Sequence, residues 1–203
     1  MSKTILPKFR IRTAPAPAEV EVSKYRQGFA FDFPLLRDAS GIMDSGSCLI
    51  LRFDPSSRLT SIDIMRTAPE IRAVDVVATA ESIERAGSIE ILNPDECWNQ
   101  TFKAHFGMDT NKNLLEIRFS RKLRSKVAVT CAKAINVELS REQKLVRIVI
   151  DMAYMANQNI ICFDGEEPHF HSWGAAVREQ LAGGGGSSGA IASRTPETGF
   201  TSS

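Results

Sequence analysis

KVAVTCAKAINVELSREQKLVRIVID, residues 126–151, is the stretch that decides the fold. It contains three short segments, 126–132, 135–139 and 144–151, in which apolar and often β-branched residues alternate with polar ones. A period of two places successive side chains on opposite faces of a strand, whereas a helix needs a period near 3.6. The stretch therefore predicts three strands, each with one face in a core and one in water, as is typical of antiparallel sheets.

The same alternation recurs along most of the chain. Turn signals such as DPSS (54–57) and NPDE (93–96) separate several of the segments. Eight further candidate strands lie at 19–25, 29–33, 48–54, 60–65, 71–77, 88–92, 114–120 and 159–164. Eleven candidates predict a mainly β protein, either an antiparallel β-sandwich or a related β-rich domain.

Helical periodicity is sparse and predicts one to three short helices. The clearest candidate is 94–106, where Trp98 and Phe102 have helical spacing, Asp95 can act as the N-cap and Gly107 can end the helix. Two other candidates lie at 78–87 and 172–182.

Both ends of the chain differ in composition from the region between them. Residues 1–18 predict an extended arm, because TAPAPA (13–18) alternates Ala with Pro and disfavours a regular helix. Residues 183–203 are dominated by Gly, Ser and Thr and predict a flexible tail, too poor in apolar groups to order itself. The β-rich core is then 19–182, and we expect both arms to gain order by lying on neighbouring molecules.

A weak internal repeat is a further hypothesis. LILRFD (49–54) resembles LEIRFS (115–120), and similar paired strands follow each of them. A repeat of 48–92 in 114–151 predicts two similar β units on either side of the 94–106 helix. Strand-rich sequences also produce such matches by chance, and the sequence leaves the two explanations open.

Composition indicates a soluble folded chain with no global charge. The 203 residues include 24% charged residues, and the formal net charge of +1 gives no field that would hold a polyanion. The four cysteines stand more than thirty residues apart without zinc-type spacing, which predicts buried thiols in a reducing compartment. No apolar run approaches the roughly 20 residues of a membrane span. We expect a cytoplasmic protein, or one in a particle assembled in the cytoplasm, with no membrane partner.

DGEEPHFHSW (164–173) holds the one candidate metal site. In a strand His169 and His171 point to the same face, and Asp164 could add an oxygen ligand. The competing interpretation is a turn entering a strand, with both imidazoles facing water or another chain. H-x-H is short and only one other histidine exists, so we expect no metal and no cofactor.

RFSRKLRSK (118–126) is the densest cluster of positive charge. The basic residues are Arg118, Arg121, Lys122, Arg124 and Lys126. Such a hairpin tip can bind a phosphate backbone or the acidic patch of a partner protein. A single aromatic residue, Phe119, offers little surface for base stacking, and a solvated strand edge would carry the same charges.

Catalytic motifs are absent from the sequence. It has neither a G-x-S-x-G nucleophile elbow nor a phosphate-binding glycine loop, and its GGGG run (183–186) lacks the Lys and Ser/Thr that bind phosphate. We therefore predict a non-catalytic structural or assembly subunit, for example of a virion-type particle, that contacts its own copies or other subunits. Two alternatives are a regulatory protein that binds nucleic acid or an acidic partner through 118–126, and a metal-dependent enzyme around His169 and His171.

Overall fold

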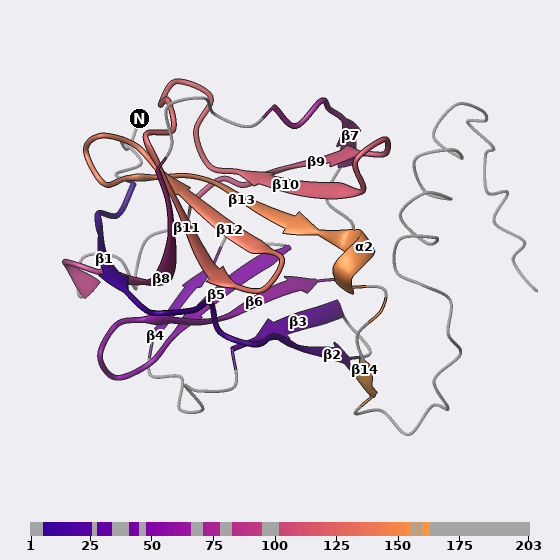
Figure 1. The fold of residues 1–203 in the computed structure, drawn as a ribbon, viewed down its shortest axis with the longest axis horizontal. Helices are drawn as coiled ribbons and strands as arrows, with labels where there is room; N and C mark the ends of the chain where they lie inside the picture. Colours follow the sequence, from indigo (N-terminus) through magenta and orange to yellow (C-terminus); the bar gives the residue numbers. More distant parts are fainter. Residues whose placement is uncertain are drawn as a thin grey trace, which may run out of the picture.

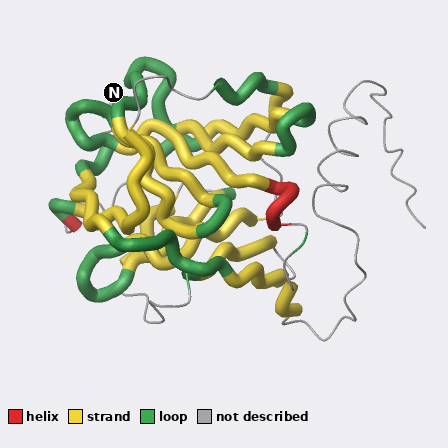
Figure 2. The backbone as a smooth tube through the Cα atoms, in the orientation of Figure 1, coloured by secondary structure: helices red, strands yellow, loops and turns green. Residues whose placement is uncertain are grey.

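A computed structural model of the chain describes residues 6–25, 28–33, 41–44, 48–65, 71–77, 83–94, 102–155, 157 and 160–162. These residues form a mainly β fold in which two sheets are packed in layers, which confirms the fold class predicted from the sequence (Figures 1 and 2). The candidate helix at 172–182, the H-x-H segment and the C-terminal tail lie outside the described residues.

The larger sheet has eight strands in the order β1-β8-β11-β12-β13-β10-β9-β7. Their bounds are β1 Phe9–Thr13, β7 Ile71–Ala73, β8 Ile83–Ile91, β9 His105–Asp109, β10 Leu114–Arg118, β11 Val127–Ala132, β12 Ile135–Leu139 and β13 Leu145–Asp151. The smaller sheet has six strands in the order β14-β2-β3-β6-β5-β4. They are β2 Glu21–Tyr25, β3 Gly28–Asp32, β4 Gly41–Asp44, β5 Leu49–Phe53, β6 Leu59–Met65 and β14 Ile160–Cys162.

One apolar core lies between the sheets, and alternate residues of each strand reach it. On β10 the buried apolar residues are Leu115 and Ile117, and on β5 every second residue from Leu49 to Phe53 is buried. The rings of Phe9 and Phe53, which come from different sheets, stack with centroids 6.4 Å apart. Burying a large apolar side chain stabilises the fold by about 1.5–3 kcal/mol, so this shared core holds the two layers together.

Four strands of each sheet are paired in the same way. In the smaller sheet Phe31 lies opposite Ile62, and Ile62 lies opposite Leu51. Adding 86 to these numbers gives Ile117, Ile148 and Val137, which are paired identically in the larger sheet. The pairing of β4 with β5 and that of β11 with β12 obey the same shift. Residues 28–65 and 114–151 are therefore equivalent structural units.

The tight turns of these units also match. The turns follow β5 and β12, and each comes just after a register shift of its hairpin. Ser57 and Gln143 hold equivalent positions with left-handed φ values of 61° and 62°. Their backbone N–H groups donate to Asp54 and Ser140 carbonyls at 2.8 and 2.9 Å.

The finding corrects the repeat suggested by the sequence. The second unit, 114–151, has the predicted bounds, but its partner is 28–65 and not 48–92. LILRFD forms β5 and LEIRFS forms β10, and these two strands hold different places in their sheets. The letters match because both strands have the same alternation of apolar and polar residues.

Each unit also gives one strand to the other sheet. β7 follows β6 in the chain but pairs in parallel with β9, with Ile71 opposite Phe106. β14 follows the second unit but pairs in parallel with β2, with Ile160 opposite Val22. The two sheets are therefore completed by reciprocal exchange, which Figure 1 shows at the edges carrying β7 and β14.

Where it describes the chain, the structure contradicts the helix predicted at 78–87 and the end of the helix predicted at 94–106. Residues 83–91 form β8, although 78–87 was predicted as a helix. In the candidate helix 94–106, Pro94 is helical and residues 95–101 lie outside the described residues, whereas residues 102–104 are irregular and His105 begins β9. Phe106 and Met108 also fit a period of two, and sheet pairing overrides the local helical spacing. The one described helix with printed bounds is α2, Met152–Met155, whose first turn is capped by the Asp151 carboxylate.

The N-terminal arm is shorter than predicted. Phe9–Thr13 form β1, which pairs antiparallel with β8, and Phe9 is fully buried. Ala18 pairs with Ala132 in the larger sheet. The alternation of Phe9 and Ile11 with Arg10 and Arg12 is the signal for this strand. Residues 9–18 thus lie on their own chain.

Candidate anion-binding pocket

The candidate site lies on the outer face of the larger sheet, across β7, β9 and β10. The residues of β10 that point away from the core are Glu116 and Arg118. Strand pairing places them opposite Gly107 and His105 of β9, and Gly107 lies opposite Arg72 of β7. Three strands thus bring two arginines, a histidine and a glutamate together on one face.

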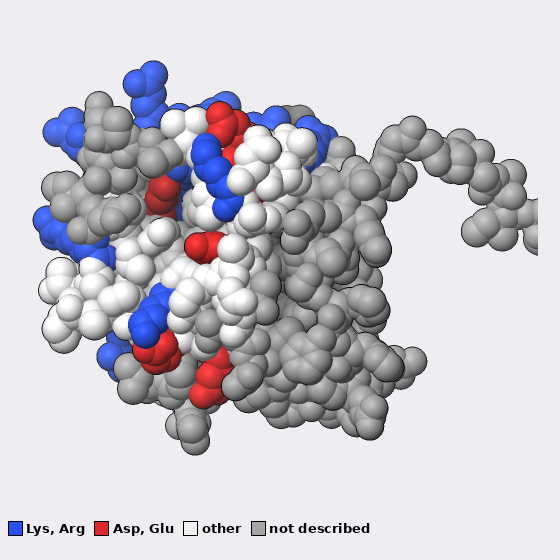
Figure 3. All heavy atoms as spheres, turned by 45° about the vertical axis from the view of Figure 1, so that its right-hand side comes forward, with Lys and Arg blue, Asp and Glu red and all other residues white. Residues whose placement is uncertain are grey.

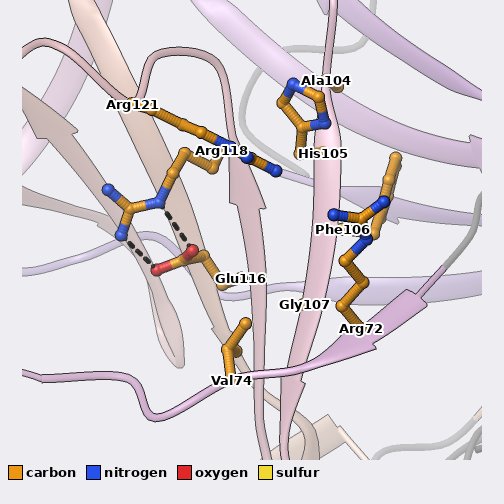
Figure 4. A pocket seen from close by; sticks show the side chains of 9 residues that line it. All are labelled: Arg72, Val74, Ala104, His105, Phe106, Gly107, Glu116, Arg118 and Arg121. Carbon is orange, nitrogen blue, oxygen red and sulfur yellow. Dashed lines mark hydrogen bonds and ion pairs between the residues drawn. The ribbon is translucent and has the colours of Figure 1, made fainter.

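These side chains and Arg121, from the segment after β10, surround a pocket of about 480 Å³. The lining residues are Arg72, Val74, Ala104, His105, Phe106, Gly107, Glu116, Arg118 and Arg121 (Figure 4). Three arginines and one glutamate give the lining a formal excess of two positive charges when His105 is neutral. A pocket of this volume can take a small ligand or one or two side chains of a partner.

Glu116 forms the floor and is fully engaged by arginine. Arg118 donates from Nε and Nη2 to the two carboxylate oxygens at 2.7 Å each, and Arg147 donates from Nη1 at 2.8 Å. Burial of Glu116 raises its pKa, but the hydrogen bonds from both guanidinium groups outweigh burial and lower the pKa below its ordinary value. Glu116 is therefore ionised at neutral pH, and the remaining positive charge faces the opening.

Behind the floor, Glu116, Arg147 and Glu138 form a buried ladder of alternating charges. Arg147 is 4% exposed, and its Nη2 donates to Glu138 at 2.8 Å and to the Val77 carbonyl at 2.8 Å. A buried pair costs desolvation and contributes to a defined geometry when every charge is matched. The ladder therefore holds the pocket floor in one arrangement.

One wall is a segment, 74–77, that crosses the outer face after β7. The Val76 N–H donates to Asp109 Oδ2 at 2.9 Å, and this hydrogen bond lowers the pKa of Asp109, against the effect of burial. Lys112 Nζ donates to the Val76 carbonyl at 2.9 Å and to Asp75 at 2.6 Å. The segment passes so close to Gly107 that an added Cβ would lie 2.7 Å from both methyl groups of Val74. Gly107, predicted as a helix stop, thus makes room for this wall.

The structure divides the predicted basic cluster between two pockets. Arg118 and Arg121 line the pocket described above. Arg124 and Lys126 line a second pocket of about 520 Å³ together with Ser125 and Arg141. Lys122 is exposed in the turn between them, where its N–H donates to Ser120 Oγ at 3.3 Å. Four of the five residues therefore line two pockets, and Lys122 lines neither.

One face of the molecule carries both signs of charge. In Figure 3, Lys and Arg side chains are spread over this face, with Asp and Glu side chains among them. This mixture agrees with the net charge of +1. The basic character is thus local to the pockets.

Sequence reasoning missed two residues of the pocket, Arg72 and His105. Arg72 was an ordinary position in a candidate strand, and His105 was placed in a candidate helix. The signal that would have found His105 is the alternation of His105, Gly107 and the apolar Phe106 and Met108, which places His105 on an outer face.

The other candidate sites are described only in part. His169, His171 and Asp164 lie outside the described residues, and within the described part of the chain no group of His, Cys, Asp and Glu could hold a metal ion. Cys48 and Cys131 are buried thiols, as expected, and burial raises the pKa of Cys131 to about 12. Such a thiol stays protonated and unreactive. Among the described residues, no helix has the length and apolar character to cross a membrane.

No protein family model matches this chain, and no curated protein has a significantly similar sequence.

Proposed function

We propose that this protein is a non-catalytic structural or assembly subunit, and that its basic pocket holds acidic side chains of a neighbouring subunit. The observation that supports the proposal is the position of Arg121 and His105, both exposed, beside a floor whose own carboxylate is already neutralised. A guanidinium forks onto a carboxylate with two parallel hydrogen bonds, which gives both strength and direction.

An acidic protein suits this pocket better than a nucleic acid does. The pocket is compact, and its one aromatic residue, Phe106, is 3% exposed and offers no stacking surface. The subunit belongs in this proposal to a cytoplasmic assembly or to a virion-type particle assembled there. The C-terminal tail, 183–203, remains a predicted further contact.

Fluorescence anisotropy with a labelled, glutamate-rich peptide tests the proposal. We expect binding that weakens with salt and that falls about tenfold in Arg121→Ala, because one charge-assisted hydrogen bond contributes about 1.5–3 kcal/mol. Arg85→Ala is the matched control, because Arg85 is exposed on β8, on the far side of the larger sheet, and carries the same charge.

Binding of a labelled single-stranded oligonucleotide tests the alternative, a protein that binds nucleic acid. If it binds more tightly than the peptide, and binding depends on Arg124 and Lys126 but not on Arg121, the protein is a nucleic-acid-binding protein and the assembly proposal is wrong. Equal peptide affinity of the wild type and Arg121→Ala also contradicts it.

A further inference from the structure

The two equivalent units carry opposite charges at the same place in their sheets. Arg118 of β10 is equivalent to Asp32 of β3, because their strands have identical pairing after the shift of 86 residues. His105 lies opposite Arg118 on β9, and Glu21 lies opposite Asp32 on β2. The outer face of the larger sheet thus has a basic pair where the smaller sheet has an acidic pair.

The acidic pair is unfavourable within its own sheet. Side chains directly opposite each other on antiparallel strands lie about 5 Å apart at Cβ, and like charges there repel. Glu21 is exposed, and Asp32 accepts a hydrogen bond of 3.1 Å from Ser23. Among the described residues no cation forms an ion pair with either carboxylate. Among the side chains that the structure describes, the acidic pair therefore has no cation that neutralises it.

We infer that the partner of the basic pocket is a second copy of this chain, which inserts its Glu21 and Asp32 pair. This inference rests on the assembly function proposed above and names the neighbour. The basic and acidic pairs lie on the outer faces of opposite sheets, so one copy can hold a neighbour on each side. A contact between two different patches of the same chain is head-to-tail, and it produces a ring or a filament.

Charge matching explains why the contact is between unlike patches. A basic pocket facing a basic pocket costs free energy, as does an acidic pair facing an acidic pair, whereas the mixed contact neutralises both. Arg121 extends the basic side beyond the sheet, which places a further cation toward an incoming carboxylate.

Analytical ultracentrifugation of the full chain tests this inference. At low salt the wild-type mass should rise with concentration, and high salt should reduce it. Arg121→Glu and Glu21→Lys should each weaken association at least about tenfold. The chain carrying both substitutions should recover association, because the charges are then exchanged across the contact. Arg85→Glu is the control and should associate like the wild type.

A mixture of variants gives a second readout. Arg121→Ala retains its acidic pair and Glu21→Gln retains its pocket, so an equimolar mixture should stop at a 1:1 dimer. If the wild type is monomeric at every concentration while the acidic peptide still binds through Arg121, the second-copy inference is wrong and the assembly proposal stands. If peptide binding is also absent, both fail. Association that neither Arg121→Glu nor Glu21→Lys changes would place the contact elsewhere.

Discussion

Arg118 and Asp32 occupy equivalent positions in two sheets that share strand order and register, and they carry opposite charges. The core residues of the two units are alike in character, because both must fill the same space between the sheets. The outer faces have no such constraint. The chain thus presents one architecture twice, with different chemistry on its two surfaces.

Leu59 and Leu145 give a direct test of the equivalence. Both are 1% exposed and begin the equivalent strands β6 and β13. Leu59→Ala and Leu145→Ala should each lower the free energy of unfolding by about 2–5 kcal/mol, from lost burial and the cavity left behind. Denaturant unfolding measures both changes. A loss below about 1 kcal/mol in either variant would contradict its place in the shared core.

Substitution of Ser57 and of Gln143 by glycine should change the stability of the fold in the same direction. Both have a left-handed φ, which costs a residue with a Cβ about 1–2 kcal/mol and costs glycine little. Ser57→Gly and Gln143→Gly should therefore raise the unfolding free energy by up to about 1 kcal/mol, less the extra entropy of the unfolded chain. Ser56→Gly, one residue earlier in an exposed position, should not stabilise. Destabilisation by both glycines would contradict the turn geometry.

Arg147 should be far more sensitive than an exposed arginine. Arg147→Met leaves Glu116 and Glu138 buried without their shared guanidinium, and breaking a buried pair costs about 3–5 kcal/mol. The control Arg141→Met, at an exposed position, should change stability by less than about 0.5 kcal/mol. Thermal or denaturant unfolding measures both changes. Similar losses of stability in the two variants would contradict the stabilising role of the buried charges around Arg147.

The lowered pKa of Asp109 predicts how the stability of the fold depends on pH in acid. Hydrogen bonding from the Val76 N–H lowers its pKa in the folded protein, so ionised Asp109 stabilises the fold above the unfolded-state pKa of about 3.9. That contribution is lost as pH falls through the lowered folded-state pKa. The stability difference between the wild type and Asp109→Asn should be constant above about pH 4 and shrink below it. Unfolding curves across this range measure it, with exposed Asp75→Asn as the control.

Gly107 and Val74 should behave as a coupled pair. Gly107→Ala places a methyl group against Val74 and should cost about 1–3 kcal/mol through overpacking. Adding Val74→Ala should recover most of this loss, whereas Val74→Ala alone should not stabilise. Additive effects in the double variant would mean that the wall segment does not depend on the close approach.

Most strands could be predicted from their alternation of apolar and polar residues, including the short β7 and β14, whereas β1, β4 and β9 could not. β12 and β13 have clear alternation, whereas β4 has only four residues, and β9 contains a glycine within an apparent helical pattern. The predicted cluster included Arg118 and Arg121 because they are close in sequence. Arg72 reaches the pocket through the parallel pairing of β7 with β9, and His105 through the antiparallel pairing of β9 with β10. Which strands pair cannot be read from a local pattern in a single sequence.

The exchange of β7 and β14 means that neither unit can be cut out as a self-sufficient domain. Each sheet would lose an edge strand, and its neighbouring strand would expose backbone groups that now have partners. Loss of one layer therefore removes support from the other, and the chain should denature in a single all-or-none transition despite its two-part architecture.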